Sequence, residues 1–473
     1  MKQSQSLLLS SLVVFSLALV IDRASAWTLP HSSTATVVIG GEHNRRLFLL
    51  RRSTFPLQAT GPIDGNNNID DENDNSSSRN RRNFFRSAAT MAATTAASIS
   101  LLVASSSSSS SSFGDVRAAN AAESTAIANS SYSKVYKPGP HSMDGKVVLI
   151  TGGNAGLGLE STKRLVEAGA TVIFTSRDAI RGNRAVEDVH SYLEEGRLKT
   201  HEYDGDASTT TTPFMGKVHV ANLDLCDIEN IKSFDDRLSS IIGKGTKIDV
   251  LVNNAGVMAI PTKQLTKDGY ERTFQTNHLG HFVLTSLLLT RLQFNARVIN
   301  VSSTAYQFAG AKDGLELDNL NGERNYGPWS SYGQSKLANI LFTNEMQDRA
   351  LKSKEWSNLR VVALHPGAVQ TDLARYVIGE EKFNTMKAGN GGTTYTSWTD
   401  KLLMEGLSKF VKTVQEGAST QIYLSSINDE ALRPGEYYSD GKVTQVLPFA
   451  RDGNKAKELW TISEKLSGVK FNL

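Results

Sequence analysis

The chain has 473 residues, and its 51 basic and 48 acidic side chains leave a net charge of only +3. So small an excess gives no field that would attract nucleic acid. A single cysteine, Cys226, excludes an internal disulfide and any metal site built from several cysteines, and we expect it to be a small buried side chain. Composition changes near residue 135, and the later part, 136–473, is long enough to bury a core as one domain.

Residues 1–26 have the anatomy of a secretory signal peptide. Lys2 precedes the apolar run LLLSSLVVFSLALVI (7–21), and Ala24-Ser25-Ala26 provides the small residues of a cleavage site. A helix over this run would reach only about 22 Å, short of a hydrocarbon core of about 30 Å. We therefore expect this segment to be removed rather than to anchor the chain.

Residues 27–135 are expected to hold a transit sequence and a disordered linker. The stretch 27–60 carries four arginines and one acid, Glu42, which is typical of transit peptides. Together with the cleavage site before Trp27, it resembles the two-part plastid presequence of diatoms and related algae. That resemblance implies that the mature protein lies in a plastid.

A further signal is encoded between residues 81 and 121. Arg81-Arg82 precedes a mildly apolar stretch, 87–104, and then Ala119-Asn120-Ala121. This pattern fits a twin-arginine signal into the thylakoid lumen, and it equally fits more transit peptide, which would leave the protein in the stroma. Whether 87–104 is cleaved or anchors the protein also stays open.

From Lys146 the sequence predicts a dinucleotide-binding turn. A buried strand over 147–150 is followed by three glycines and then by helical spacing of apolar residues over 159–168. Such a turn brings backbone N–H groups at a helix N-terminus to a pyrophosphate. The expected cofactor contacts here are Gly152, Gly156, Leu157 and Gly158.

The second predicted strand, 171–175, ends in Ser176-Arg177 rather than in an acid. An acid there would bind the ribose hydroxyls of NAD, whereas an arginine can pair with the 2′-phosphate of NADP. Arg177 therefore predicts NADP(H) as cofactor, with a solvated surface arginine as the alternative. The polar stretch 196–216, before the next strand at 217–221, is expected to be a surface loop.

Several motifs occur in the order of the short-chain dehydrogenase/reductase family, which this chain resembles over about 140–473. They are TGGNAGLG (151–158), NNAG (253–256), Ser303, Tyr332-x-x-x-Lys336 and Pro366-Gly367. The blocks NNAGVM (253–258), QTNHLGHFVLT (275–285) and YGQSKLANILFT (332–343) look most like its retinol dehydrogenase-like branch.

The resemblance implies an α/β fold: a Rossmann-type doubly wound parallel sheet of about seven strands with helices on both faces. It also implies further cofactor contacts. Asp224 and Leu225 would flank the adenine, Asn254, Ala255 and Gly256 would line the cleft, and Thr371 would meet the carboxamide of nicotinamide.

Tyr332 and Lys336 lie at i and i+4 of a predicted helix, so both project from one face. An ammonium near a phenol favours the phenolate, so we expect the pKa of Tyr332 to be lowered and Tyr332 to be the proton donor. Lys336 would also hold the nicotinamide ribose. Ser303, after the strand 298–301, can stabilise an oxyanion, whereas Ser302 points to the opposite face. Asn277 resembles the family's structural asparagine, which holds a water for proton relay.

The remaining candidates are read as structural or substrate-related. His278, His281 and His365 have no carboxylates at metal spacing beside them, so we expect no metal site. The insert 308–326 is expected to loop out beside the pocket. Apolar residues and glycines in 373–410 predict a lid over a lipophilic substrate, with core or a dimer surface as alternatives.

The leading hypothesis is an NADP(H)-dependent enzyme that interconverts a carbonyl and an alcohol on a small hydrophobic, retinoid- or isoprenoid-like substrate. A protochlorophyllide reductase is the first alternative, but the NNAG and YGQSKLANILF blocks and the single cysteine argue against it. A non-catalytic NADP-binding regulator is the second, and the intact Tyr332 and Lys336 argue against that. Peripheral membrane contact and a homodimer stay open.

Overall fold

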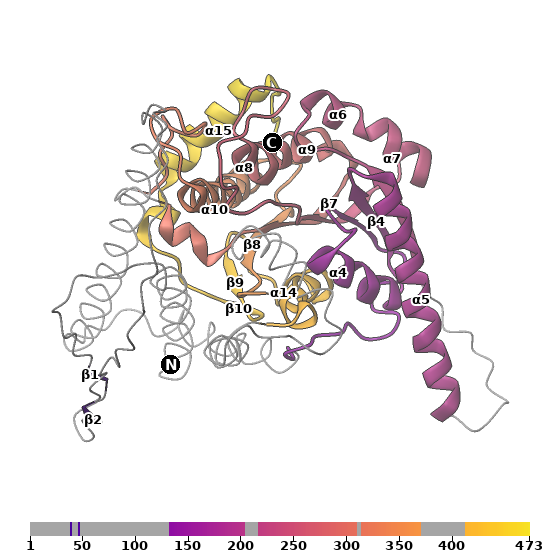
Figure 1. Ribbon diagram of the computed structural model, residues 1–473. Helices are drawn as coiled ribbons and strands as arrows, with labels where there is room; N and C mark the ends of the chain where they lie inside the picture. The colour runs from indigo at the N-terminus through magenta and orange to yellow at the C-terminus, as the bar shows by residue number, and fades with distance from the viewer. Residues whose placement is uncertain (1–37, 40–45, 48–131, 204–215, 310–313, 370–411) are drawn as a thin grey trace, which may run out of the picture. The chain divides into compact units, whose positions relative to one another are not determined.

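The computed structural model describes residues 38–39, 46–47, 132–203, 216–309, 314–369 and 412–473, without the side chains of 197–203. Residues 1–112 form one unit, described only at the antiparallel pair β1 (Val38–Ile39) and β2 (Arg46–Leu47). All other elements belong to a second unit, shown in colour in Figure 1. The predicted signal peptide, the predicted twin-arginine signal, Thr371 and the predicted lid 373–410 lie outside the described residues.

A sheet of eight strands in the order β10-β9-β8-β7-β6-β3-β4-β5 forms the centre of the second unit. In this sheet all neighbouring strands from β9 through to β5 pair in parallel. The edge strand β10 pairs antiparallel with β9. Because β3 lies between β4 and β6, the winding direction reverses there, and such sheets bind ligands at the carboxyl ends of the strands beside this point. The expected doubly wound, Rossmann-type fold is confirmed. The strands are β3 (Val147–Ile150), β4 (Thr171–Ser176), β5 (Lys217–Asn222), β6 (Ile248–Asn253), β7 (Leu292–Val301), β8 (Arg360–His365), β9 (Tyr437–Ser439) and β10 (Lys442–Val443).

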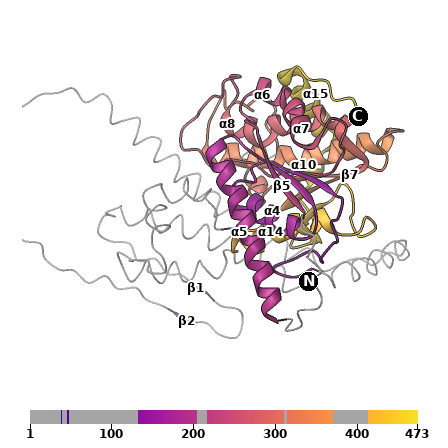
Figure 2. The same cartoon turned by 90° about the vertical axis from the view of Figure 1, so that its right-hand side faces the viewer.

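Helices cover both faces of the sheet, as Figures 1 and 2 show. One face carries α4 (Gly156–Glu167), α5 (Ala179–Tyr203) and α14 (Val414–Ser426). The other carries α6 (Ile228–Lys232), α7 (Phe234–Ile242), α9 (Gly280–Leu287) and α10 (Pro328–Lys352). Smaller elements are α8 (Arg272–Phe274), the π-helix η1 (Gln275–Leu279), and the 3₁₀ turns η2 (Leu289–Arg291), η3 (Thr304–Phe308) and η5 (Pro448–Arg451). None of the helices in the described ranges is long and apolar enough to cross a bilayer.

Alternation along the strands divides the core into two layers. On β3, Leu149 belongs to the cluster beneath α9 and α10, whereas Val148 and Ile150 belong to the cluster beneath α4 and α14. Buried strands of this kind, apolar on both faces, are typical of a parallel sheet covered by helices.

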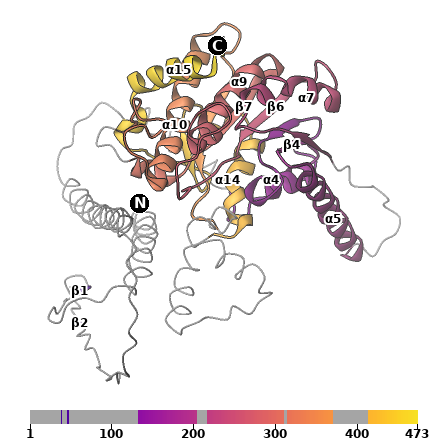
Figure 3. The same ribbon diagram turned by 45° about the horizontal axis from the view of Figure 1, so that its top comes forward.

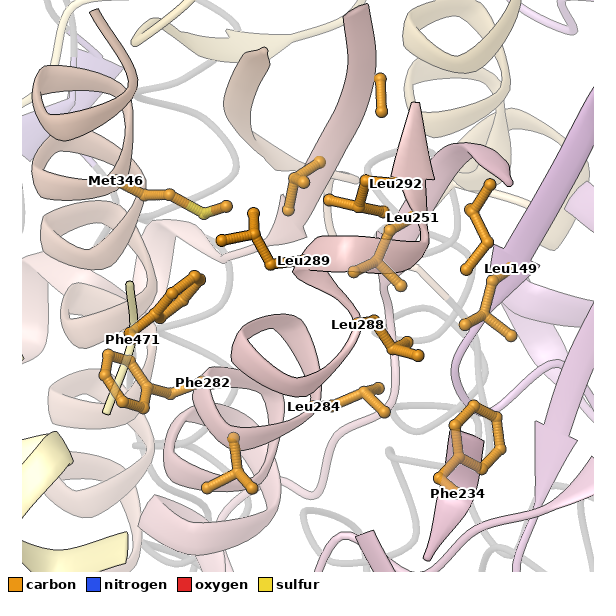
Figure 4. Close-up of a cluster of buried hydrophobic side chains, with 14 of the residues drawn as sticks. Leu149, Phe234, Leu251, Phe282, Leu284, Leu288, Leu289, Leu292, Met346 and Phe471 are labelled. Carbon is orange, nitrogen blue, oxygen red and sulfur yellow. The ribbon is translucent and has the colours of Figure 1, made fainter. Parts of the chain in front are cut away.

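The C-terminal helix α15 (Gly453–Ser467) packs along α10, and Figure 3 shows the two side by side. Its Trp460 stacks on Phe471 of the following tail, with ring centroids 4.7 Å apart. Both aromatic rings contact Phe282 of α9 and Phe342 of α10. Figure 4 shows Phe282 and Phe471 side by side at one end of this apolar cluster. The chain therefore covers the outer apolar faces of α9 and α10 with its own C-terminal segment.

Helix α4, which follows the glycine turn, is held by α14 from the C-terminal part of the chain. The buried Arg164 of α4 pairs with Glu160 at 2.6 Å and donates to the Gln415 carbonyl of α14 at 2.8 Å. From α14, Gln421 Nε2 donates to the Leu157 carbonyl at 3.1 Å. Helix α4 is thus braced by residues more than 250 positions later in the sequence.

One predicted boundary is wrong. Helix α5 continues to Tyr203, so the first eight residues of the predicted loop 196–216 are helical. Gly196 lowers helix propensity at one position, but the strong helix formers around it, in YLEEGRLK, outweigh that cost.

Candidate active site

The glycine turn between β3 and α4 has the backbone that the sequence predicts. Gly152 and Gly156 have φ of +66° and +54°, a region that side chains disfavour. A Cβ on Gly158 would lie 2.6 Å from the Gly152 carbonyl oxygen, so only glycine fits there. The N-cap of α4 is Ala155, no side chain caps the helix, and its first turn has no acid. The first N–H groups of α4 are therefore free to bind an anion such as a pyrophosphate.

The segment 253–256 lies against this turn. The main-chain amides of Asn254 and Ala255 both donate to Thr151 Oγ1 at 2.9 Å, and Asn254 Nδ2 donates to the Thr151 carbonyl at 2.7 Å. A Cβ on Gly256 would lie 3.1 Å from Asn277 Oδ1 and 3.5 Å from Lys336 Nζ. The structure thus brings the predicted cofactor residues of the NNAG segment to Asn277 and Lys336.

Arg177 is exposed at the end of β4. Its neighbour Arg181 is paired with Asp178 at 3.3 Å, whereas the Arg177 guanidinium has no ion-pair partner among the described residues. Arg177 is therefore free to bind an anionic group of a ligand at this edge of the sheet.

Asp224 and Leu225 form the turn after β5. Asp224 Oδ1 accepts from the Cys226 amide at 2.9 Å, and Leu225 is buried against Gly280, where an added Cβ would lie 2.7 Å from the Leu225 carbonyl oxygen. Cys226 is only partly buried, and its Sγ lies 3.1 Å from Thr276 Oγ1. The expectation of a buried cysteine is therefore met only in part, because the residue belongs to this turn at the end of the strand rather than to the core.

Tyr332 and Lys336 lie one turn apart on α10 and are 7% and 4% exposed. Lys336 Nζ lies 5.7 Å from the centroid of the Tyr332 ring and donates to the Val301 carbonyl at 3.0 Å. The Ser303 side chain caps η3 by accepting from the Ala305 amide at 3.1 Å, and it lies near enough to the Tyr332 hydroxyl to favour the ionised form of the phenol. Ser302 Oγ instead donates to the Lys336 carbonyl at 2.7 Å. Of the two serines, Ser303 is the one that reaches the phenol.

Burial dominates the protonation of this pair. It raises the pKa of Tyr332 to about 12, although the nearby Ser303 side chain acts in the opposite direction. Burial also lowers the pKa of Lys336 to about 8. The expectation of a lowered pKa for the phenol is thus not met by the protein's own groups. The loss of hydration destabilises the phenolate more than the Ser303 side chain stabilises it. Tyr332 is protonated at neutral pH and has a proton to donate.

Asn277 lies in the π-helix η1, a backbone irregularity that is frequent at functional sites. Its side chain accepts from the Val257 amide at 2.8 Å and donates to the Val257 carbonyl and to Ser335 Oγ, each at 2.9 Å. Ser335 Oγ in turn donates to the Tyr332 carbonyl at 2.7 Å. Asn277 therefore joins the segment after NNAG to the helix that carries Tyr332. Its role in holding a water stays a prediction.

The three histidines make separate hydrogen bonds. His278 Nε2 lies 3.0 Å from Ser463 Oγ, His281 bridges Thr151 and the Asn277 carbonyl, and His365 Nδ1 accepts from the Gly367 amide at 3.1 Å. Burial lowers the pKa of each imidazole, so all three are neutral at physiological pH. No group of three potential metal ligands occurs in the described ranges.

The described part of the insert, 314–326, packs beside the site. Tyr326 Oη donates to the Ile260 carbonyl at 2.6 Å, and Lys263 Nζ donates to the Gly322 carbonyl at 3.1 Å. The insert is therefore fastened to the segment that follows NNAG, and Tyr332 remains one helical turn from Lys336 as in an uninterrupted helix.

Sequence reasoning missed three residues that connect this site: Thr151, His281 and Ser335. Thr151 was visible as the residue before Gly152, and His281 as the residue four positions after Asn277. Neither spacing by itself indicates a contact between them, because 130 positions separate the two.

Comparison with known proteins agrees with this fold and site. The family profile described as short chain dehydrogenase matches residues 146–225 and 216–313. The chain belongs to the short-chain dehydrogenase/reductase family, whose members are oxidoreductases that bind a nicotinamide cofactor.

Within the family, the chain is similar to retinol dehydrogenases. Retinol dehydrogenase 14 of Mus musculus is 36% identical over 336 residues, which cover 70% of this chain and 88% of that protein. Retinol dehydrogenase 12 of Homo sapiens is 34% identical over 333 residues, which cover 70% and 88%. A crystal structure of an uncharacterised protein from Mycobacterium paratuberculosis superposes with a TM-score of 0.50 at 31% identity, covering 71% of this chain and 100% of that one.

Proposed function

We propose that this protein is an NADP(H)-dependent oxidoreductase that interconverts a carbonyl and an alcohol on a small lipophilic substrate. The observation that carries the proposal is the buried Tyr332 side chain, which lies beside Ser303 and one helical turn from the buried Lys336. The similarity to retinol dehydrogenases supports an apolar alcohol or aldehyde as substrate.

The residues at the carboxyl ends of β3, β4 and β6 fit a dinucleotide. The uncapped N-terminus of α4 suits the pyrophosphate, and the space that Gly256 leaves beside Asn277 and Lys336 suits the nicotinamide ribose. Arg177, exposed and without an ion-pair partner among the described residues, suits the 2′-phosphate of NADP(H). When bound, this cofactor supplies or accepts the hydride.

The chain's own groups handle the proton and the geometry. In reduction Tyr332 donates its hydroxyl proton to the substrate oxygen, and in oxidation it accepts that proton. The Ser303 hydroxyl, which lies beside Tyr332, stabilises the charge that develops on the same oxygen. Lys336 has three N–H donors and uses one on the Val301 carbonyl, so two remain for the ribose hydroxyls.

The test is turnover of retinoid, apocarotenoid and aliphatic carbonyls, followed by the loss of NADPH absorbance. Tyr332→Phe removes only the ionisable hydroxyl, so we expect kcat to fall by about 10²- to 10⁴-fold while the NADPH Kd stays close to wild type. Residual activity above roughly a tenth of wild type would show that Tyr332 is not the proton donor. NADPH binding without turnover of any carbonyl would instead favour a non-catalytic regulator.

We also propose that the protein acts in a plastid, because the Ala24-Ser25-Ala26 cleavage site precedes an arginine-rich, acid-poor segment. A fluorescent fusion of residues 1–135 should accumulate in plastids, and secreted or cytosolic fluorescence would contradict the proposal. Replacing Arg81 and Arg82 by Lys separates lumen from stroma. A twin-arginine signal predicts that protease protection inside isolated thylakoids is lost on this replacement, and absence of protection in the unaltered protein would assign it to the stroma.

A further inference from the structure

His281 links the segment expected to line the cofactor to the residues around Tyr332. Its Nδ1 lies 3.0 Å from the Asn277 carbonyl oxygen, and its Nε2 lies 2.9 Å from Thr151 Oγ1. The side chain is 2% exposed, so no water competes for these two bonds. The imidazole therefore bridges the end of β3 and the π-helix η1.

The partners determine the tautomer. A carbonyl oxygen only accepts, so Nδ1 must carry the proton. Burial holds the pKa of His281 at about 4, and the nearby charge of Lys336 acts in the same direction, so the ring is neutral and Nε2 is an acceptor. Thr151 then donates its hydroxyl to Nε2, since its other acceptor, the Val252 carbonyl, is more distant at 3.4 Å.

This assignment gives every hydrogen bond in the chain of contacts the same direction. The amides of Asn254 and Ala255 donate to Thr151, Thr151 donates to His281, and His281 donates to the Asn277 carbonyl. Bonds aligned in this way polarise and strengthen one another.

The Asn277 side chain links this carbonyl to the helix that carries Tyr332. Its Nδ2 donates to Ser335, which donates to the Tyr332 carbonyl. A path of hydrogen bonds thus runs from the NNAG amides to the backbone of Tyr332; it passes through the covalent bonds of Asn277, and its hydrogen bonds are buried from Thr151 onward.

We propose that His281 is a positioning residue that couples occupation of the cofactor-binding segment 254–256 to the placement of Asn277 and Tyr332. The proposal rests on the proposed function, because it assigns these residues to cofactor and proton donor. A movement of the NNAG amides on binding is passed through Thr151 and His281 to η1. Histidine suits this position because its donor and acceptor sit on opposite sides of a rigid ring, whereas an amide carries both on one carbon.

Two substitutions separate the two halves of the bridge. In His281→Asn the amide can replace Nδ1 and keep the bond to the Asn277 carbonyl, but it is too short to reach Thr151. In His281→Gln the longer amide can replace Nε2 and keep Thr151, but it loses the Asn277 carbonyl. His278→Gln is the matched control, since His278 lies in η1, is equally buried, and bonds outward to Ser463.

The experiment measures hydrogen–deuterium exchange of the full chain with and without NADPH, together with kcat and KM. In wild type, NADPH should slow exchange of the amides in 275–279. Both His281 variants should lose this effect while still binding NADPH, and kcat should fall about 10- to 100-fold with KM for the carbonyl unchanged. His278→Gln should lower Tm without changing the NADPH effect or kcat.

Each contrary result overturns a defined part. If NADPH leaves exchange over 275–279 unchanged in wild type, there is no coupling, whatever the variants do. If the His281 variants retain the NADPH effect and wild-type kcat, or if His278→Gln matches their loss of kcat, His281 is only a core residue. If wild type does not bind NADPH at all, the proposed function falls, and this inference with it.

Discussion

The charge of Lys336 should control the pH dependence of cofactor binding. Burial lowers the pKa of this amine to about 8, so about 90% of the free protein carries the ammonium at pH 7 and about 10% at pH 9. A bound anionic cofactor favours the charged form and raises the pKa in the complex. Affinity is therefore fully present below pH 8 and falls as pH rises through 8. The NADPH Kd should increase about tenfold between pH 7 and pH 9, which corresponds to about 1.4 kcal/mol.

The assay is a fluorescence titration with NADPH at fixed ionic strength from pH 7 upward, where the 2′-phosphate, with a second pKa of about 6, is already ionised. Lys336→Met is the control, because it keeps a long apolar side chain without a titrating group. It should bind NADPH more weakly, with a Kd that hardly changes over the same range. A flat profile in wild type, or the same slope in Lys336→Met, would refute this account of the buried amine.

Two further changes test the cofactor preference and the core. Arg177→Ala should raise the NADPH Kd about tenfold and leave the NADH Kd unchanged. About tenfold is the smallest effect expected for a charge-assisted hydrogen bond, because the Arg177 side chain is exposed to solvent. Equal losses for both cofactors in calorimetric titrations would make Arg177 merely structural. Phe471→Ala should lower the free energy of unfolding by about 3–5 kcal/mol in urea, since the ring is 3% exposed and packs on Trp460, Phe282 and Phe342. A loss below about 1 kcal/mol would show that the tail is not part of the core.

The parts of the site that follow from local pattern could be predicted. The glycine turn follows from a strand, three glycines and a helix, and the choice of Ser303 over Ser302 follows from the alternation of side chains along a strand. The end of α5 was misplaced because the polar composition of 196–216 predicts a loop, whereas the strong helix formers around Gly196 continue the helix to Tyr203. These are features that neighbouring residues determine.

Features that depend on how deeply a side chain is buried, or on contacts between residues far apart in the sequence, could not be predicted. The pKa of Tyr332 is raised because α10 buries the phenol, and the sequence does not reveal how deeply a helix face is covered. The bridge through His281 joins residues 130 positions apart, so neither Thr151 nor His281 stands out by spacing. Thr371 and the lid 373–410 lie outside the described residues and stay predictions.

The bracing of α4 by α14 has a consequence for the order of folding. The helix whose N-terminus we propose as the pyrophosphate site is held by Gln415, through Arg164, and by Gln421, through the Leu157 carbonyl, so this support is complete only after residues 412–426 have folded onto α4. Closing so long a loop is entropically costly and makes this contact slow to form. Cofactor capture should therefore be a late event that follows assembly of the sheet rather than guiding it. A ligand that binds only the finished fold stabilises that fold alone, so NADPH would distinguish completed chains from those whose C-terminal helices have not yet docked.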